Sequence, residues 1–130
     1  MRYIQVHENA KKDLLELEKM DVLAAATIAV VLEESQANPR IIETLTTSGS
    51  NNSGSVRLGI KRWESMWQRA TDLWRFRVFD TPATNYRVIY GYHWPTRNLC
   101  VLAVVHKESF DYDDLNSDIA KRIINDWGSL

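Results

Sequence analysis

The sequence predicts a single α+β domain over residues 1–130, in which an N-terminal strand and a helical hairpin pack on an antiparallel β-sheet and a short helix closes the chain. Three observations lead to this prediction. Apolar residues recur with helical spacing in the first 40 residues, three strand-like stretches follow one another between residues 73 and 112, and an amphipathic stretch ends the sequence. Strands joined by short turns pair antiparallel, so the central stretches predict a meander.

The N-terminal part predicts one strand and two helices. Residues 2–6 carry enough apolar content for a short strand, and an apolar stripe over residues 8–20 predicts the first helix. Asp21 is suited to cap a second helix over residues 22–36, which the Asn-Pro step at Pro39 brings to an end. Because almost no linker separates the two helices, we expect an antiparallel hairpin.

Residues 41–72 have the least regular pattern. The 41–45 segment fits either an irregular stretch or a short helix, residues 46–55 have the composition of a flexible loop, and residues 56–60 alternate like a strand. Large side chains then recur with the spacing of a short amphipathic helix, and we expect them to be buried or to lie at an interface. A base-stacking platform is the less favoured alternative. These side chains are Trp63, Met66, Trp67 and Trp74.

The meander between residues 73 and 112 contains most of the candidate functional residues. In its first strand, side chains alternate so that Trp74 faces one side and Arg75 and Arg77 the other. The second strand contains Arg87, and the third, residues 99–105, is apolar like a buried central strand. We therefore expect one small region to contain Arg75, Arg77, Arg87, His106, Lys107 and Tyr112.

The C-terminal stretch predicts one more helix. Ser117 is suited to cap a helix over residues 118–127, and Gly128 is suited to end it. The apolar face of this helix consists of Ile119, Ile123, Ile124 and Trp127.

Several classes of protein are disfavoured by the composition. The single cysteine, Cys100, lies in the most apolar strand, which is typical of a reducing compartment. The N-terminus has no apolar signal segment, and the longest apolar run is too short to span a bilayer, so we expect a cytoplasmic protein with no membrane partner. The histidines and the cysteine lack metal-ligand spacing, so we expect no metal site and no cofactor.

Charge is distributed unevenly along the chain, although the net charge is only −1. Residues 56–107 hold 9 basic and 3 acidic side chains, whereas both flanking regions are acidic. A basic centre predicts a cationic face for an anionic partner. Chance clustering along solvated strand edges remains the alternative.

The stretches LWRFRV, YRVIYGY and VLAVVHKESFDY, in this order after a helical pair, resemble the RelE/ParE superfamily of bacterial toxins. Members are small α+β proteins encoded beside an antitoxin, and the RelE branch cleaves mRNA on the ribosome without a metal. The resemblance implies catalytic roles for Arg77, Arg87, His106 and Tyr112, and we add RNA-binding roles for Arg75, Lys107 and Arg62. The sequence differs from the family in its His-Lys pair after the last strand and in its long, Trp-rich 46–72 segment.

Cleavage of RNA by its own 2′-OH needs a proton acceptor, charge stabilisation at the phosphate and a proton for the leaving oxygen. Arg77 and Arg87 suit the phosphate, since a guanidinium stays charged and binds it through two donors. His106 is the expected general acid or base, and Tyr112 is expected to donate a hydrogen bond or to stack on a base.

Structural roles for these residues stay open. Arg75 and Arg77 could line a solvated sheet face, and Arg87 could pair with Asp80 or Asp111. His106 could be a hydrogen-bonded residue at a strand end, and a one-residue change of register would move it to the other face of the sheet. Tyr112 could be a core residue.

Two other functions are possible alternatives. The first is a ParE-like toxin that inhibits DNA gyrase by protein contacts, which the His106 and Tyr112 pair disfavours; the second is a family member without catalysis. The expected partners are mRNA, the ribosome and a cognate antitoxin whose acidic or amphipathic segment covers the basic face or displaces the last helix. Oligomerisation with the antitoxin is expected as well.

Overall fold

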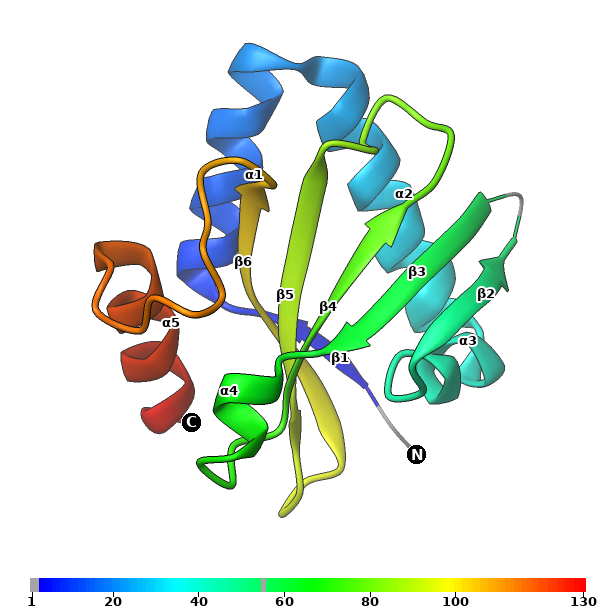
Figure 1. The fold of residues 1–130 in the computed structure, drawn as a ribbon. Helices are drawn as coiled ribbons and strands as arrows, with labels where there is room; N and C mark the ends of the chain where they lie inside the picture. Colours follow the sequence, from blue (N-terminus) through cyan, green and yellow to red (C-terminus); the bar gives the residue numbers. More distant parts are fainter. Residues whose placement is uncertain (1–2, 55) are drawn as a thin grey trace.

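The computed structural model describes residues 3–54 and 56–130, so Arg2 of the predicted first strand and Ser55 of the predicted loop lie outside the described residues. The chain is an α+β fold with one sheet and helices on both of its sides (Figure 1). In chain order the elements are β1 (Ile4–Val6), α1 (Glu8–Met20), α2 (Val22–Ala37), α3 (Pro39–Thr44), β2 (Gly49–Ser53), β3 (Val56–Arg62), α4 (Glu64–Trp67), β4 (Leu73–Val78), β5 (Tyr86–His93), β6 (Asn98–His106) and α5 (Asp118–Gly128).

The sheet has six strands in the order β1-β6-β5-β4-β3-β2. Strands β2 to β6 pair antiparallel, as expected for strands that follow one another across short connections. The predicted antiparallel sheet is thus confirmed for these five strands, but the sheet as a whole is mixed, because β1 pairs parallel with β6. These two strands are joined through the whole chain between them, so no short turn constrains their direction, and the sheet is mixed.

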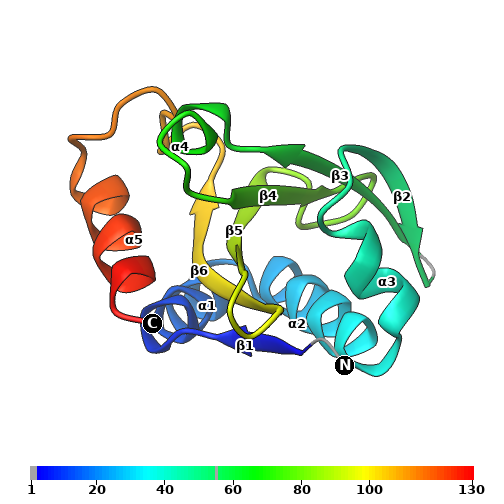
Figure 2. The same cartoon turned by 90° about the horizontal axis from the view of Figure 1, so that it is seen from below.

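The α1–α2 hairpin covers one face of the sheet, as Figures 1 and 2 show. Asp21 ends α1 and caps α2, where its side chain accepts a hydrogen bond from the Ala24 amide at 3.1 Å. The helices pack on the alternate residues of β4 and β5 that point toward them, which form one hydrophobic core with the helix side chains. These strand residues include Trp74, Phe76, Val78, Val88 and Tyr90.

A second core lies on the opposite face, where α5 packs beside β6 and α4 lies near the ends of β3 and β4 (Figure 2). Ser117 caps α5 through the Ala120 amide, at 3.2 Å. Trp63, Met66 and Cys100 are all buried in this core. Since α4 and α5 cover only the end of this face near β6 and the start of β4, the side chains farther along β3, β4 and β5 lie outside the second core.

A β-bulge divides β6 into two parts. Ala103 pairs with Ile89 and Val101 pairs with Tyr90, so Leu102 is an additional residue on β6. Leu102 and Ala103 both point into the second core, and the alternation of β6 changes phase there. Strict alternation starting at Leu99 would assign each β6 side chain to one face of the sheet. After the bulge, every β6 side chain lies on the opposite face from that assignment.

Residues 41–72 differ most from the sequence-based expectation. The short helix that was one alternative for residues 41–45 is present as α3, whereas the predicted 46–55 loop contains the strand β2. β2 is held at the sheet edge by pairing with β3 and carries no apolar side chain, so its composition gives no strand pattern. The predicted short helix of the tryptophan segment is the four-residue α4. Trp63, Met66 and Trp74 are buried as expected, whereas Trp67 is 41% exposed.

Candidate functional site

Basic side chains gather on the sheet face that α1 and α2 do not cover. Because strand residues alternate, Arg75 and Arg77 on β4 point away from the helices, as the sequence predicts. Arg87 of β5 lies on the same face, since its neighbours Tyr86 and Val88 pack toward the helices. We call Arg75, Arg77, Arg87 and the Tyr112 side chain the arginine cluster.

The three arginines interact electrostatically with one another. Burial is the main cause of the lowered pKa of Arg75, and the charge of Arg77 lowers it further while Tyr112 raises it. Burial also lowers the pKa of Arg87, with additional lowering by Arg77 and Arg75. Guanidinium groups stay protonated under all physiological conditions, so the cluster holds three partly desolvated positive charges close together. Such a group of charges favours an anion.

No carboxylate neutralises these arginines in the described part of the chain. Arg75 donates to the Gly59 carbonyl at 3.3 Å, and Arg87 donates to the carbonyls of Thr84 and Tyr86, each at 3.0 Å. Arg77 stacks on Phe79, with its guanidinium carbon 4.4 Å from the ring centroid, and its buried Nε has no hydrogen-bond partner among the described residues. Arg87 could have paired with Asp80 or Asp111. Neither pair occurs among the ion pairs of the described residues.

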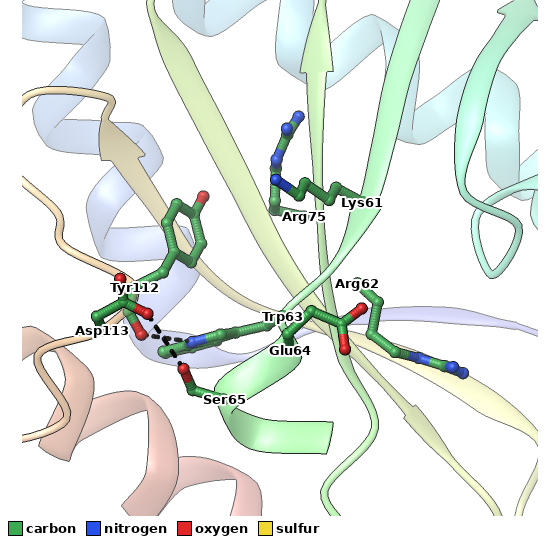
Figure 3. Close-up of a pocket in the computed structure, with 8 residues that line it drawn as sticks. All are labelled: Lys61, Arg62, Trp63, Glu64, Ser65, Arg75, Tyr112 and Asp113. Atoms are coloured by element: carbon green, nitrogen blue, oxygen red, sulfur yellow. Dashed lines mark hydrogen bonds between the residues drawn. The ribbon is translucent and has the colours of Figure 1, made fainter. Parts of the chain in front are cut away.

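Tyr112 reaches the cluster from the loop between β6 and α5. In Figure 3 its ring extends to the same side of the sheet as the Arg75 side chain. Its hydroxyl is buried and has no hydrogen-bond partner among the described residues. Burial raises the pKa of this phenol, while Arg75 and Arg87 act in the opposite direction. At neutral pH the phenol is therefore protonated and acts as a hydrogen-bond donor.

A pocket of about 290 Å³ lies beside Arg75 and Tyr112 (Figure 3). Its rim carries positive and negative side chains. The carboxylates of Glu64 on α4 and Asp113 in the 107–117 loop lie near the basic residues of β3 and β4. Glu64 makes no side-chain hydrogen bond or ion pair among the described residues, whereas Asp113 accepts from the Ser65 hydroxyl at 3.3 Å. The pocket is lined by Lys61, Arg62, Trp63, Glu64, Ser65, Arg75, Tyr112 and Asp113.

His106 lies on the other face of the sheet, so the prediction that one region holds all six side chains is wrong for it. His106 pairs with Tyr86 across β5 and β6, and the two rings meet edge-on with centroids 5.2 Å apart. The imidazole borders a surface hollow with residues of α1, including Asp13 and Glu16. Its Nδ1 accepts from the Glu108 amide at 3.2 Å, which matches the alternative of a hydrogen-bonded strand end. The β6 bulge is the cause, because it reverses the facing of residues beyond Leu102.

Two further predicted RNA-binding residues do not join the cluster. Lys107 follows β6 in a turn, where its amide donates to the Asn85 carbonyl at 2.8 Å, and its exposed side chain makes no described contact with the arginines. Arg62 borders the pocket, but its guanidinium turns away from Arg75 (Figure 3). It lies 3.8 Å from the Trp67 ring centroid and 3.3 Å from Asp72 Oδ1.

Sequence reasoning missed Lys61 and Arg57. Lys61 pairs with Arg75 across β3 and β4, and Arg57 and Arg77 both stack on Phe79 with guanidinium carbons 4.4 Å from its centroid. The signal was present, since the alternation that puts Val56, Leu58 and Ile60 on one face puts residues 57, 59 and 61 on the other. Lys61 extends the positive charge of the cluster to β3.

Two negative observations concern the described residues alone. Residues 3–54 and 56–130 include no group of three or more His, Cys, Asp or Glu side chains arranged to hold a metal ion. Within these same ranges no helix has the length and apolarity needed to cross a membrane.

No protein-family model matches the chain, and no curated protein matches it significantly.

Proposed function

We propose that the chain is a toxin of a type II toxin–antitoxin system that resembles the RelE branch, and that it is a metal-independent endoribonuclease acting on mRNA at the ribosome. The supporting observation is the arginine cluster, in which three guanidinium groups adjoin a buried phenol and have no carboxylate partner among the residues that the structure describes. A phosphodiester fits this group, because its oxygens accept from several guanidinium donors at once.

The cluster supplies charge stabilisation in the proposed reaction. Attack of the 2′-OH on the adjacent phosphorus forms a new P–O bond and breaks the bond to the 5′ oxygen, which leaves a 2′,3′-cyclic phosphate and a 5′-hydroxyl end. Negative charge increases on the non-bridging oxygens during attack. Arg77 and Arg87 bind these oxygens, and Arg75 holds the neighbouring backbone. One well-placed donor of this kind typically contributes about 10²–10³ in rate.

His106 neither donates nor accepts a proton in the proposed reaction, because it lies on the face of the sheet that the helices cover. The raised pKa of Tyr112 keeps its phenol protonated, so it donates toward the leaving 5′ oxygen. The pocket carboxylates are the proton acceptors beside the cluster, and Glu64 is our candidate for the 2′-OH proton since Asp113 accepts from Ser65. The histidine role expected from the sequence is withdrawn.

A gyrase-inhibiting toxin of the ParE type is the second candidate. His106 and Tyr112 do not form a catalytic pair that would disfavour it, because His106 lies on the opposite face of the sheet. The observation favouring a nuclease over it is the Tyr112 hydroxyl beside Arg75, which has no hydrogen-bond partner in the described part of the chain and which a protein-binding surface does not require.

A neutralising antitoxin is part of the proposal. Three partly buried positive charges that have no carboxylate partner in the described ranges suit an acidic segment, which competes with RNA for the same donors. Co-expression with the neighbouring gene tests this partner, because a neutralising complex restores growth, and a variant lacking the acidic segment does not.

The experiment for the proposed function uses the purified chain, ribosomes and a defined mRNA, with the 5′ ends of the products mapped. The expected result is cleavage by the unaltered protein and a loss of at least about a hundredfold in Arg87→Ala. Arg40→Ala serves as the charge-matched control, because Arg40 is an exposed residue of α3. Intact mRNA, together with a DNA-damage response on expression, would reject the nuclease and support gyrase inhibition.

A further inference from the structure

Trp63 is buried beside the arginine cluster and lines the same pocket as Arg75 and Tyr112. It follows directly after β3, where its amide donates to the Leu73 carbonyl at 2.9 Å, and its side chain is 2% exposed. The following residues turn into α4, so the end of β3 fixes the backbone that carries the indole. This residue belongs to the Trp-rich segment, whose large side chains the sequence predicts to be buried or at an interface.

The indole of Trp63 makes a long-range hydrogen bond to the loop that carries Tyr112. Its Nε1 donates to the Tyr112 carbonyl oxygen at 2.8 Å, across 49 residues of chain. A second link runs parallel to it, from the Ser65 hydroxyl to Asp113 Oδ1 at 3.3 Å (Figure 3). The start of the α4 segment therefore holds two successive residues of the 107–117 loop.

The rings of Trp63, Phe110 and Tyr112 form a closed triad. Trp63 meets Phe110 at a centroid distance of 5.3 Å and Tyr112 at 5.5 Å, and Phe110 meets Tyr112 at 4.8 Å. All three contacts are edge-to-face, the favoured geometry for aromatic pairs. The base of the Tyr112 ring is thus held on two sides by other rings.

The outer end of Tyr112 has no comparable anchor. Its hydroxyl makes no hydrogen bond to any described residue, and its neighbours there are the charges of Arg75 and Arg87. The position of the phenol oxygen consequently depends on what holds the backbone and the base of the ring. Trp63 is the residue that contacts both.

From these contacts we infer that Trp63 is a positioning residue that aims the Tyr112 phenol at the arginine cluster. Its consequence for RNA cleavage rests on the proposed function, whereas its consequence for the orientation of Tyr112 does not. The Trp-rich segment then has a specific role, since it supplies the indole that holds the loop between β6 and α5 against β3.

The test compares Trp63→Phe with Trp67→Phe in the full chain. Trp63→Phe keeps an aromatic ring and removes the N–H donor, while Trp67 lies in the same segment, is 41% exposed and stacks on Arg62. Tyrosines labelled with ¹³C at Cζ report the pKa of Tyr112 by NMR titration, with Tyr112→Phe assigning the signal. Nuclear Overhauser contacts between the Tyr112 ring and the Arg75 side chain report its orientation.

In Trp63→Phe we expect the pKa of Tyr112 to fall toward its ordinary value, because the released ring gains water, and the contacts to Arg75 to weaken. Trp67→Phe leaves both unchanged. On RNA, Trp63→Phe lowers kcat by roughly tenfold to a hundredfold with little change in KM, since the arginines remain in place.

An unchanged Tyr112 pKa and unchanged contacts in a folded Trp63→Phe protein would overturn the inference and leave Trp63 a core residue only. If that variant does not fold, Phe110→Leu loosens the same ring from its other side, and an unaltered Tyr112 signal there overturns the inference as well. A wild-type protein that cleaves no RNA but shows the expected changes at Tyr112 rejects the nuclease and retains the positioning role.

Discussion

Tyr86 packs edge-on against His106, with ring centroids 5.2 Å apart, on the face of the sheet that the helical hairpin covers. The next residue on β5, Arg87, points to the opposite face. This relationship separates the imidazole from the arginine cluster by the thickness of the sheet.

The first prediction concerns His106 itself. His106→Ala leaves the rate of RNA cleavage within about twofold of the unaltered protein, because the imidazole cannot reach a phosphate bound by Arg87. Loss of the ring contact with Tyr86 lowers the free energy of unfolding by about 1 kcal/mol. Single-turnover cleavage assays and urea denaturation measure the two effects. A hundredfold loss of rate in a stably folded His106→Ala protein would show that the imidazole takes part in the reaction.

The second prediction separates stability from activity at Tyr112. Tyr112→Phe removes a buried hydroxyl that has no described partner, so the free energy of unfolding stays the same or rises by up to about 1 kcal/mol. Cleavage falls by about 10²–10⁴, since the leaving oxygen loses its proton donor. Thermal denaturation and the cleavage assay are run on the same sample. A marked loss of stability would mean that the hydroxyl is satisfied in the folded chain and is structural.

The third prediction is a loss of stability in alkaline solution. Burial raises the pKa of the Cys100 thiol from 9.0 to about 11. The folded state therefore keeps the proton over a range in which the unfolded chain has lost it. This contribution is fully present below about pH 9, declines as the pH rises from there toward 11, and amounts to at most about 3 kcal/mol.

Cys100→Ala tests this prediction, because alanine does not titrate while the buried tyrosines titrate in both proteins. The difference in the free energy of unfolding between Cys100→Ala and the unaltered protein is expected to shrink by up to about 3 kcal/mol between pH 8 and 11. Parallel pH profiles for the two proteins would contradict the assigned burial of the thiol.

The fourth prediction concerns the packing of α5 on the sheet at Gly91. A Cβ at Gly91 would overlap the Trp127 ring and lie 2.7 Å from Leu73 Cδ2, so Gly91→Ala forces α5 away from the sheet. We expect a loss of about 1–3 kcal/mol in the free energy of unfolding. Gly128→Ala is the control, because nothing lies within 4 Å of the added carbon. Equal denaturation midpoints for the two variants would show that α5 moves without cost.

Local sequence patterns predicted much of the fold and four of the six side chains that were expected to share one region. The alternation that puts Arg75 and Arg77 on one face, the antiparallel meander and the Asp21 and Ser117 caps are all present. Each depends on residues close together in the chain. The same alternation, applied to residues 57–61, would also have identified Lys61.

The features that were missed depend on distant pairing. β2 is a strand because β3 lies beside it, and its own residues carry no apolar alternation. The parallel pairing of β1 with β6 joins opposite ends of the chain. The bulge at Leu102 falls inside an unbroken apolar run, so no residue type marks it, yet it reverses the facing of His106. Trp63 acts on Tyr112 only because the fold brings residues 49 positions apart together.

The central claim is that the arginine cluster binds a phosphodiester of RNA. Fluorescence anisotropy with a short RNA that carries 2′-deoxy substitution at the scissile position measures binding without cleavage. We expect Arg75→Ala, Arg77→Ala and Arg87→Ala each to weaken binding by about tenfold and to reduce its dependence on salt, while Arg40→Ala and His106→Ala bind like the unaltered protein. Equal affinities for all five variants would contradict the claim.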